Sequence, residues 1–166
     1  NVAVDATATG YNAFASASAQ YGASQYASGT DASVELTNSG TINVDANANA
    51  SGSFADARAS ATGVIQSTFG DTVLATFDNT STGTFTVDAN ATATGANSFA
   101  DAAAAGVIVQ GDPVVIDFTN AKTFTVKAVA EANDVAADAL GLGVYADYGS
   151  WTGVTVSDTG NWTGLN

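Results

Sequence analysis

A segment of the form Val-Asp-Ala-x-Ala-x recurs along the chain at intervals of about forty residues, and this repeat constrains the fold more than any other feature. The valines that open the four copies, the last of them faint, are 40, 43 and 39 residues apart: Val4, Val44, Val87 and Val126. An Asn/Ser/Gly turn precedes the second and third copies, and a Phe-Ala-x-Ala segment follows each of the first three. Repeats of this length indicate an architecture in which each unit stacks on its neighbours.

The alternation of apolar and polar side chains within each copy decides between helix and strand. Between Ile42 and Ser51 the apolar residues, mostly Ala, occupy one parity, and Asn, Asp and Ser occupy the other. A period of two places the two kinds of side chain on opposite faces of a strand. Asn, Asp and Ser also compete with a helical backbone, whereas Thr suits a strand. We therefore expect an all-β chain, in which the Ala-rich stretch near Val135 to Leu140 is the candidate for a short helix.

A strand face lined by Ala lets facing strands approach closely, which leaves a thin, dry interior. A parallel β-solenoid (β-helix) fits this description, because its coils stack about 4.8 Å apart and equivalent positions form columns. Forty residues of strand span roughly 130 Å, so each repeat is either one broad coil or two coils of about twenty residues. The alternative is an antiparallel β-sandwich subunit of a fibre, built from the same strands. We divide this single repeat domain approximately into residues 1–32, 33–72, 73–114 and 115–153, with a C-terminal cap or assembly segment at 154–166.

Composition excludes most kinds of catalytic and metal site. The chain has no His and no Cys, and therefore no Ser-His-Asp or Cys-His nucleophile, no imidazole or thiolate zinc site and no disulfide. It has 3 Lys and Arg against 16 Asp and Glu, a net charge of −13. Nucleic acid is not an expected partner, since its affinity comes mainly from Lys and Arg. We also expect no enzymatic activity.

Several features favour a secreted protein. The chain begins at Asn1 rather than Met, has no positively charged leader and has no apolar run long enough to cross a bilayer. We therefore interpret it as a mature, processed or excised segment without a membrane span. Because Cys and Met are absent, no side chain oxidises easily. Scarce Lys and Arg leave few sites for trypsin-like proteases, so we expect the chain to work outside the cell or on its surface.

Three consecutive segments carry a resemblance to a known kind of protein. They are Asn38-Ser39-Gly40-Thr41-Ile42, then Val44 to Ala50, then Ala57 to Gly63 with Val64-Ile65-Gln66. This series resembles the repeats of large bacterial surface proteins, the adhesin-like and autotransporter-passenger-like β-solenoids. The likeness covers most of residues 33–145 and weakens in the last copy, where Lys122 stands for the turn glycine and Lys127 for the aspartate. It implies a right-handed β-helix with a structural or adhesive role, and it brings no catalytic residues.

Two sets of carboxylates recur at equivalent repeat positions. The first comprises Asp5, Asp45 and Asp88, and the second comprises Asp56, Asp101 and Asp138. Stacking would turn each set into a ladder, whose unpaired carboxylates either take up a divalent cation or stay hydrated. Calcium is the candidate cofactor, with Asp5, Asp45, Asp88, Asp56 and Asp101 as its ligands. The alternative is a solvated acidic face that keeps a filament soluble, and neither the EF-hand nor the nonapeptide calcium repeat is present.

Other polar positions suggest further alternatives. Lys127, which replaces an aspartate, could pair with Asp88 or, if buried, form an isopeptide bond. Partial pairs of hydroxyls that suggest ice binding occur at Thr7, Thr9, Thr92 and Thr94. The glycosylation sequence Asn-x-Ser/Thr occurs at Asn49, Asn79, Asn90 and Asn161. Such matches arise by chance in a chain this rich in Asn, Ser and Thr.

The two ends of the chain differ from its middle. Tyr residues occur among Ser, Ala and Gln in residues 11–30, and Tyr and Trp occur among Gly and Thr near the C-terminus. Aromatic residues can close a repeat array or lie at the centre of an interface. Neither Lys nor Pro blocks the edge of the first expected strand, residues 2–9. The candidate assembly residues are Val2, Val4, Tyr11, Tyr21, Tyr145, Trp151 and Trp162.

Together these observations predict a secreted structural subunit whose partner is another copy of itself. It would assemble head to tail, by edge stacking or strand donation, into an extracellular filament or surface fibre. The alternative is an adhesin segment that binds glycan, mineral or a cell surface through its acidic polar face, with calcium as a cofactor. Ice binding is the third expectation.

Overall fold

The computed structural model describes residues 1–112, 114–133, 136–146, 151–158 and 161–165, and every regular element in them is a β-strand. The strands form three sheets in which all neighbours are parallel. Sheet A contains, in spatial order, β1 (Val2–Thr9), β4 (Thr41–Ser51), β7 (Thr84–Thr94), β10 (Thr123–Ala132) and β13 (Asn161–Leu165). Sheet B contains β2 (Asn12–Ser28), β5 (Phe54–Phe69), β8 (Asn97–Asp112) and β11 (Ala136–Ala146). Sheet C contains β3 (Asp31–Asn38), β6 (Thr72–Asn79), β9 (Val114–Asn120) and β12 (Trp151–Asp158).

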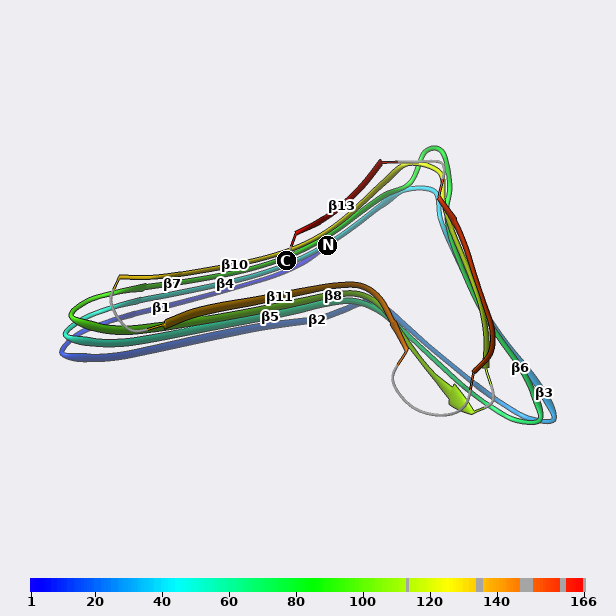
Figure 1. The fold of residues 1–166 in the computed structure, drawn as a ribbon, viewed down its shortest axis with the longest axis horizontal. Helices are drawn as coiled ribbons and strands as arrows, with labels where there is room; N and C mark the ends of the chain where they lie inside the picture. The colour runs from blue at the N-terminus through cyan, green and yellow to red at the C-terminus, as the bar shows by residue number, and fades with distance from the viewer. Residues whose placement is uncertain (113, 134–135, 147–150, 159–160, 166) are drawn as a thin grey trace.

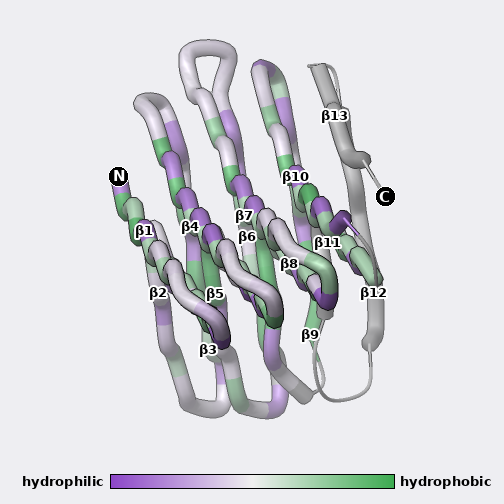
Figure 2. The backbone as a smooth tube through the Cα atoms, turned by 90° about the vertical axis from the view of Figure 1, so that its left-hand side faces the viewer, coloured by the Kyte–Doolittle hydropathy of each residue, from purple (hydrophilic) through white to green (hydrophobic). Residues whose placement is uncertain are grey.

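Each repeat forms one broad coil that contributes one strand to each sheet. The chain passes through sheets A, B and C in turn before the next coil begins. Viewed along the stack, the coils superpose: sheets A and B run side by side as two long limbs, and sheet C diverges from them (Figure 1). Turned by 90°, the same coils lie side by side (Figure 2). The predicted parallel β-solenoid is confirmed, whereas the antiparallel sandwich and the division into two smaller coils per repeat are wrong.

The expectation of a short helix near Val135 to Leu140 is also wrong for the residues that the structure describes. Residues from Ala136 onward belong to β11, which pairs with β8 in register from Ala136 opposite Phe99. Backbone hydrogen bonds to the preceding coil override the helical preference of Ala in this segment. Val135 lies outside the described residues.

The register between coils agrees with the repeat in the later copies and departs from it in the first. Val44, Val87 and Val126 lie in one column, as predicted. Val4, however, lies opposite Ala46, and the residue opposite Val44 is Val2. Because the displacement is two residues, the inward and outward faces of the strand are unchanged.

Glycine turns explain this displacement. The amide of Gly10 donates to the carbonyl of Ser51, and the amide of Gly52 donates to the carbonyl of Thr94, so successive turns stack at the end of sheet A. A Cβ at Gly52 would overlap the carbonyl oxygen of Gly10, which explains why this close stacking requires glycine. The first copy has two fewer residues than the second between its valine and this turn. The turns stay aligned, and the valine motif moves out of register.

The interior changes character along the coil. Between sheets A and B it consists largely of buried Ala columns, such as Ala48 beside Ala91 and Ala57 beside Ala100. At the wide end, where sheet C diverges, four buried Phe rings stack in two pairs, Phe77 with Phe118 and Phe85 with Phe124, at centroid distances of 5.3 and 4.5 Å. Ala lets the two limbs approach closely, and the larger rings fill the space where they separate.

Candidate functional site

The outer face of sheet A carries the first predicted carboxylate set, and the structure brings two of its three members together. Asp45 lies opposite Asp88 on the neighbouring strand. Asp5 lies instead opposite Asn47, whose side-chain amide donates to Asp5 Oδ1 at 2.9 Å. The predicted ladder through Asp5 is therefore wrong, because the turn register of the first coil displaces this aspartate by two positions. Lys127 continues the column on the other side of Asp88.

Asp88 has the most perturbed surroundings of this column. Burial raises the pKa of its carboxyl, the neighbouring Asp45 raises it further, and Lys127 opposes both effects. Asp88 Oδ1 is buried without a hydrogen-bond partner, whereas Asp45 Oδ2 accepts a hydrogen bond from the amide of Asn43 at 2.7 Å. The Asp88 carboxyl therefore holds a proton more readily than an ordinary solvated carboxyl does.

The described residues contain no group of three or more carboxylates close enough to hold a metal ion. Asp45 and Asp88 offer one adjacent pair, with neighbouring amides, and Asp5 does not join them. Calcium binding at this column stays a prediction.

The second predicted carboxylate set, on the outer face of sheet B, does not form a ladder across β5 and β8. Asp101 lies opposite Arg58 and Asp138, whereas Asp56 lies opposite Phe14 and Phe99. The glycine turns again set the register. Phe14 and Phe99 each lie four residues after the glycine of their turn, whereas Phe54 lies only two residues after Gly52. The prediction that Asp56 and Asp101 share one column is therefore wrong. The displacement instead places the Asp56 carboxylate between the rings of Phe14 and Phe99.

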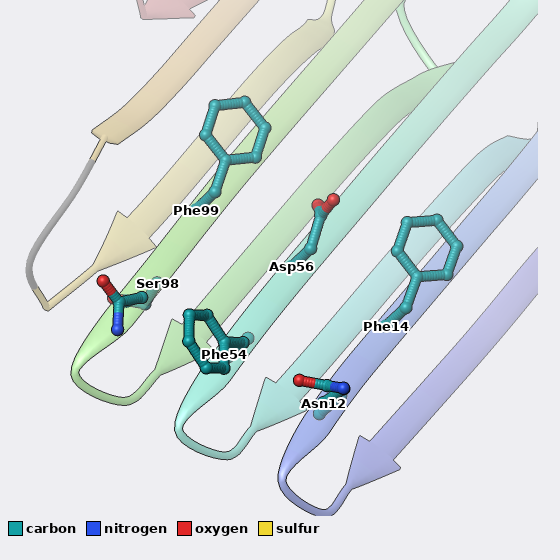
Figure 3. A pocket seen from close by; sticks show the side chains of 9 residues that line it. Asn12, Phe14, Phe54, Asp56, Ser98 and Phe99 are labelled. Atoms are coloured by element: carbon teal, nitrogen blue, oxygen red, sulfur yellow. The ribbon is translucent and has the colours of Figure 1, made fainter.

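A groove opens on this face around Asp56, and we call it the aromatic groove. It has a volume of about 510 Å³, and its lining residues are Asn12, Ala13, Phe14, Phe54, Ala55, Asp56, Asn97, Ser98 and Phe99. Phe14, Asp56 and Phe99 rise side by side from three neighbouring strands, with Phe54 in the adjoining row (Figure 3). Phe14 is 59% exposed and Phe54 is 47% exposed, so the groove presents adjacent aromatic side chains to solvent, as interaction sites do.

Arg58 lies beside the aromatic groove and contacts three of its side chains. Its Nε and one terminal nitrogen donate to the two carboxylate oxygens of Asp56 at 3.0 and 2.9 Å. This hydrogen-bonded ion pair raises the pKa of the Arg58 guanidinium. The guanidinium carbon lies 5.7 Å from the ring centroids of both Phe14 and Phe99, within the range of cation–π attraction.

Sequence reasoning did not single out this groove, although the pattern contains its signal. Phe14 has the parity of Asn12 and Ser16 rather than that of Ala13 and Ala15, so alternation alone places its ring outside the core. The register that brings Phe14, Asp56 and Phe99 together depends on the turns, and the repeat motif does not show it.

A second feature that the sequence reasoning missed is a buried ladder of Asn side chains at the turn from sheet C to sheet A. The amide of Asn38 donates to Asn79 Oδ1 at 2.8 Å, and the amide of Asn79 donates to Asn120 Oδ1 at 2.7 Å. Each of these two amides also donates to a backbone carbonyl, of Thr84 and Thr123 respectively. The side chain of Asn79 is fully buried, so its Asn-x-Ser/Thr sequence is not an accessible glycosylation site in the folded chain.

The predicted assembly residues divide into two groups. Val2 and Val4 point inward, half-buried, on β1, and Tyr11 is exposed with its ring edge-on to Phe54 at 5.5 Å. Tyr21 has a positive φ of 59° at a bulge in β2. The remaining residues are known by backbone register: Tyr145 opposite Ile108, Trp151 opposite Val114 and Trp162 opposite Phe124.

Comparisons of the chain with protein-family models, with curated proteins and with solved structures found no match. Across the described residues, no helix is long and apolar enough to span a membrane.

Proposed function

We propose that this chain is a secreted structural subunit that assembles head to tail into an extracellular filament or surface fibre. The observation that carries the proposal is the parallel, in-register stacking of coils, which offers the same backbone pairing at each step. A further coil, from another copy, would extend the three sheets by repeating this pairing, either by edge stacking or by donation of a strand. The proposal assigns the chain no catalytic role.

The first coil supports growth at its edge. β1, β2 and β3 are the outermost described strands of their sheets, and residues 1–38 contain no Lys, Arg or Pro to discourage pairing. The bulge at Tyr21 interrupts β2, whereas β1 and β3 pair with their neighbours without a register shift. A head-to-tail contact that does not close into a ring produces a filament.

Negative-stain microscopy and sedimentation velocity of the purified chain over a range of concentrations test the proposal. We expect filaments or a concentration-dependent series of oligomers. Val4→Lys places a charge on the inward face of the edge coil, where another coil would bury it, and should suppress assembly. Thr7→Lys adds the same charge to the exposed outer face of β1 and is the matched control. Monomers at all concentrations, with and without salt and calcium, would contradict the proposal.

A second candidate function is adhesion through the acidic face of sheet A, with glycan or mineral as the ligand and calcium as the bridging ion. The observation that favours it is the adjacent pair Asp45 and Asp88, whose mutual repulsion a divalent cation would relieve. Calcium titration by calorimetry, with Asp45→Ala plus Asp88→Ala as the variant, tests this function. Binding that is unchanged in the double variant would exclude the column as the site.

A further inference from the structure

We propose that the aromatic groove on the outer face of sheet B binds a linear, neutral polysaccharide. This inference is independent of end-to-end assembly, because stacking at the coil edges leaves the outer face of the sheet open.

The rings of the aromatic groove are spaced for a repeating ligand. Phe14 and Phe99 occupy the same row on β2 and β8, two strand steps apart. Two steps correspond to about 9.5 Å along the stacking direction, which is close to the length of one disaccharide unit. The face of an aromatic ring is electron-rich and attracts the polarised C–H groups on the face of a sugar ring. A chain of sugar rings lying along the stack could therefore meet Phe14 and Phe99 in turn.

Polar side chains alternate with these rings across the three strands of the groove. Asp56 lies between Phe14 and Phe99 in one row, and Asn12 and Asn97 lie on either side of Phe54 in the next. Asn12 and Asn97 are exposed, so their amides are open to a ligand in the groove. A mostly apolar cleft with a few convergent polar groups is the usual form of a small-molecule or glycan subsite, and about 510 Å³ lies in the usual size range.

Arg58 contacts three side chains of the site in the absence of a ligand. Its two hydrogen bonds fix the Asp56 carboxylate, and its guanidinium lies against both flanking rings. Because all these side chains are on regular strands rather than on loops, little conformational entropy is lost on binding.

Charge selects a neutral ligand over other partners. The chain carries −13 in total, and Arg58, the one cation beside the groove among the described residues, is already paired with Asp56. An anionic polysaccharide would be repelled as it approached this face. A neutral polysaccharide, with apolar ring faces and hydroxyl edges, matches both the rings and the amides.

Co-sedimentation with insoluble cellulose, chitin and a β-1,3-glucan tests the proposal, with alginate gel as the anionic comparison. A tube without polysaccharide measures any sedimentation of the chain itself. The result therefore does not depend on whether the chain forms filaments. The test variant is Phe14→Ala plus Phe99→Ala. The matched control is Tyr26→Ala plus Phe69→Ala, an exposed aromatic pair outside the groove on β2 and β5, with ring centroids 6.1 Å apart.

We expect the chain to be retained on at least one of the three neutral polymers. The affinity should fall at least about tenfold in the groove variant, because two ring contacts are lost, and it should be unchanged in the control. Circular dichroism should show the same strand content in both variants, since all four rings are outside the core. Retention on none of the neutral polymers, retention on alginate alone, or equal loss in both variants would overturn the proposal. Self-association that the groove variant alone abolishes would also overturn it, in favour of a contact between copies.

Discussion

The side-chain amide of Asn79 donates to Oδ1 of Asn120 in the next coil at 2.7 Å, in the interior of the solenoid where both side chains are fully buried. The same amide donates to the carbonyl of Thr123, and Asn79 Oδ1 accepts from Asn38 in the preceding coil. One side chain thus joins three coils at the corner between sheets C and A. Buried amides stabilise a fold when their partners are present and destabilise it when a partner is removed.

Asn79→Leu should therefore destabilise the chain by about 3 kcal/mol, because it removes the hydrogen bonds of Asn79 with Asn38 and Asn120 from the buried interior, where water cannot replace them. The control is Asn90→Leu, which removes a similar cross-coil hydrogen bond, Asn90 to Asn47 Oδ1 at 2.9 Å, from the outer face of sheet A. Water can replace that bond, so we expect a loss below about 1 kcal/mol. Urea unfolding measures both changes. Equal losses of unfolding free energy would show that the buried hydrogen bonds of the ladder stabilise the fold no more than an exposed one does.

Gly63, within β5 of sheet B, offers a second test. A Cβ at Gly63 would overlap the ring of Phe85 and the carbonyl oxygen of Gly106. Gly63→Ala should cost roughly 1–3 kcal/mol, because the ring or the adjoining strand must move. Gly40→Ala is the control, since a Cβ there would meet nothing within 4 Å. Thermal unfolding of the two variants compares them, and a Gly63→Ala chain as stable as Gly40→Ala would mean that this position in β5 tolerates a side chain.

The raised pKa of Asp88 predicts how stability depends on pH. Burial and Asp45 make the folded chain hold this proton more tightly than the unfolded chain does. Stability should then fall as pH rises from the ordinary carboxyl pKa through the raised value in the folded chain. Asp88→Asn should remove this decline and should make the chain more stable than wild type at neutral pH. Urea midpoints at several pH values measure the effect.

The control for this prediction is Asp31→Asn, which removes one negative charge at an exposed position at the start of β3. If both variants gain equal stability at neutral pH, the gain comes from reduced net charge, and the local environment of Asp88 does not explain it.

The sequence predicted stacked parallel coils, although it left an antiparallel sandwich and two coils per repeat open, because the repeat period and the parity of the apolar residues are both visible in it. Ala46 and Ala89 point inward and Asn47 and Asn90 point outward, as the alternation requires. The same rule could have located the buried ladder, since Asn38 has the inward parity of Val34 and Leu36.

Register could not be obtained in this way. The first-coil aspartate Asp5 and the second-coil Phe54 each lie two residues from the place that motif alignment gives them. A displacement of two preserves every inward and outward position, so hydrophobic burial does not distinguish the alternatives. Stacked glycine turns decide between them, and their consequence, a carboxylate between two rings, becomes visible only when the coils are placed side by side.

The Ala columns between sheets A and B predict intolerance of larger side chains. Ala91 on β7 is fully buried, with Ala48 and Ala130 beside it on the neighbouring strands. Ala91→Leu would force the two limbs apart over several coils and should cost at least about 1–3 kcal/mol. Thr92→Leu adds a similar side chain on the outer face of the same strand and should change stability by less than about 0.5 kcal/mol. Urea unfolding distinguishes the two variants. If the Ala91→Leu chain has wild-type stability, the interior between sheets A and B is not closely packed.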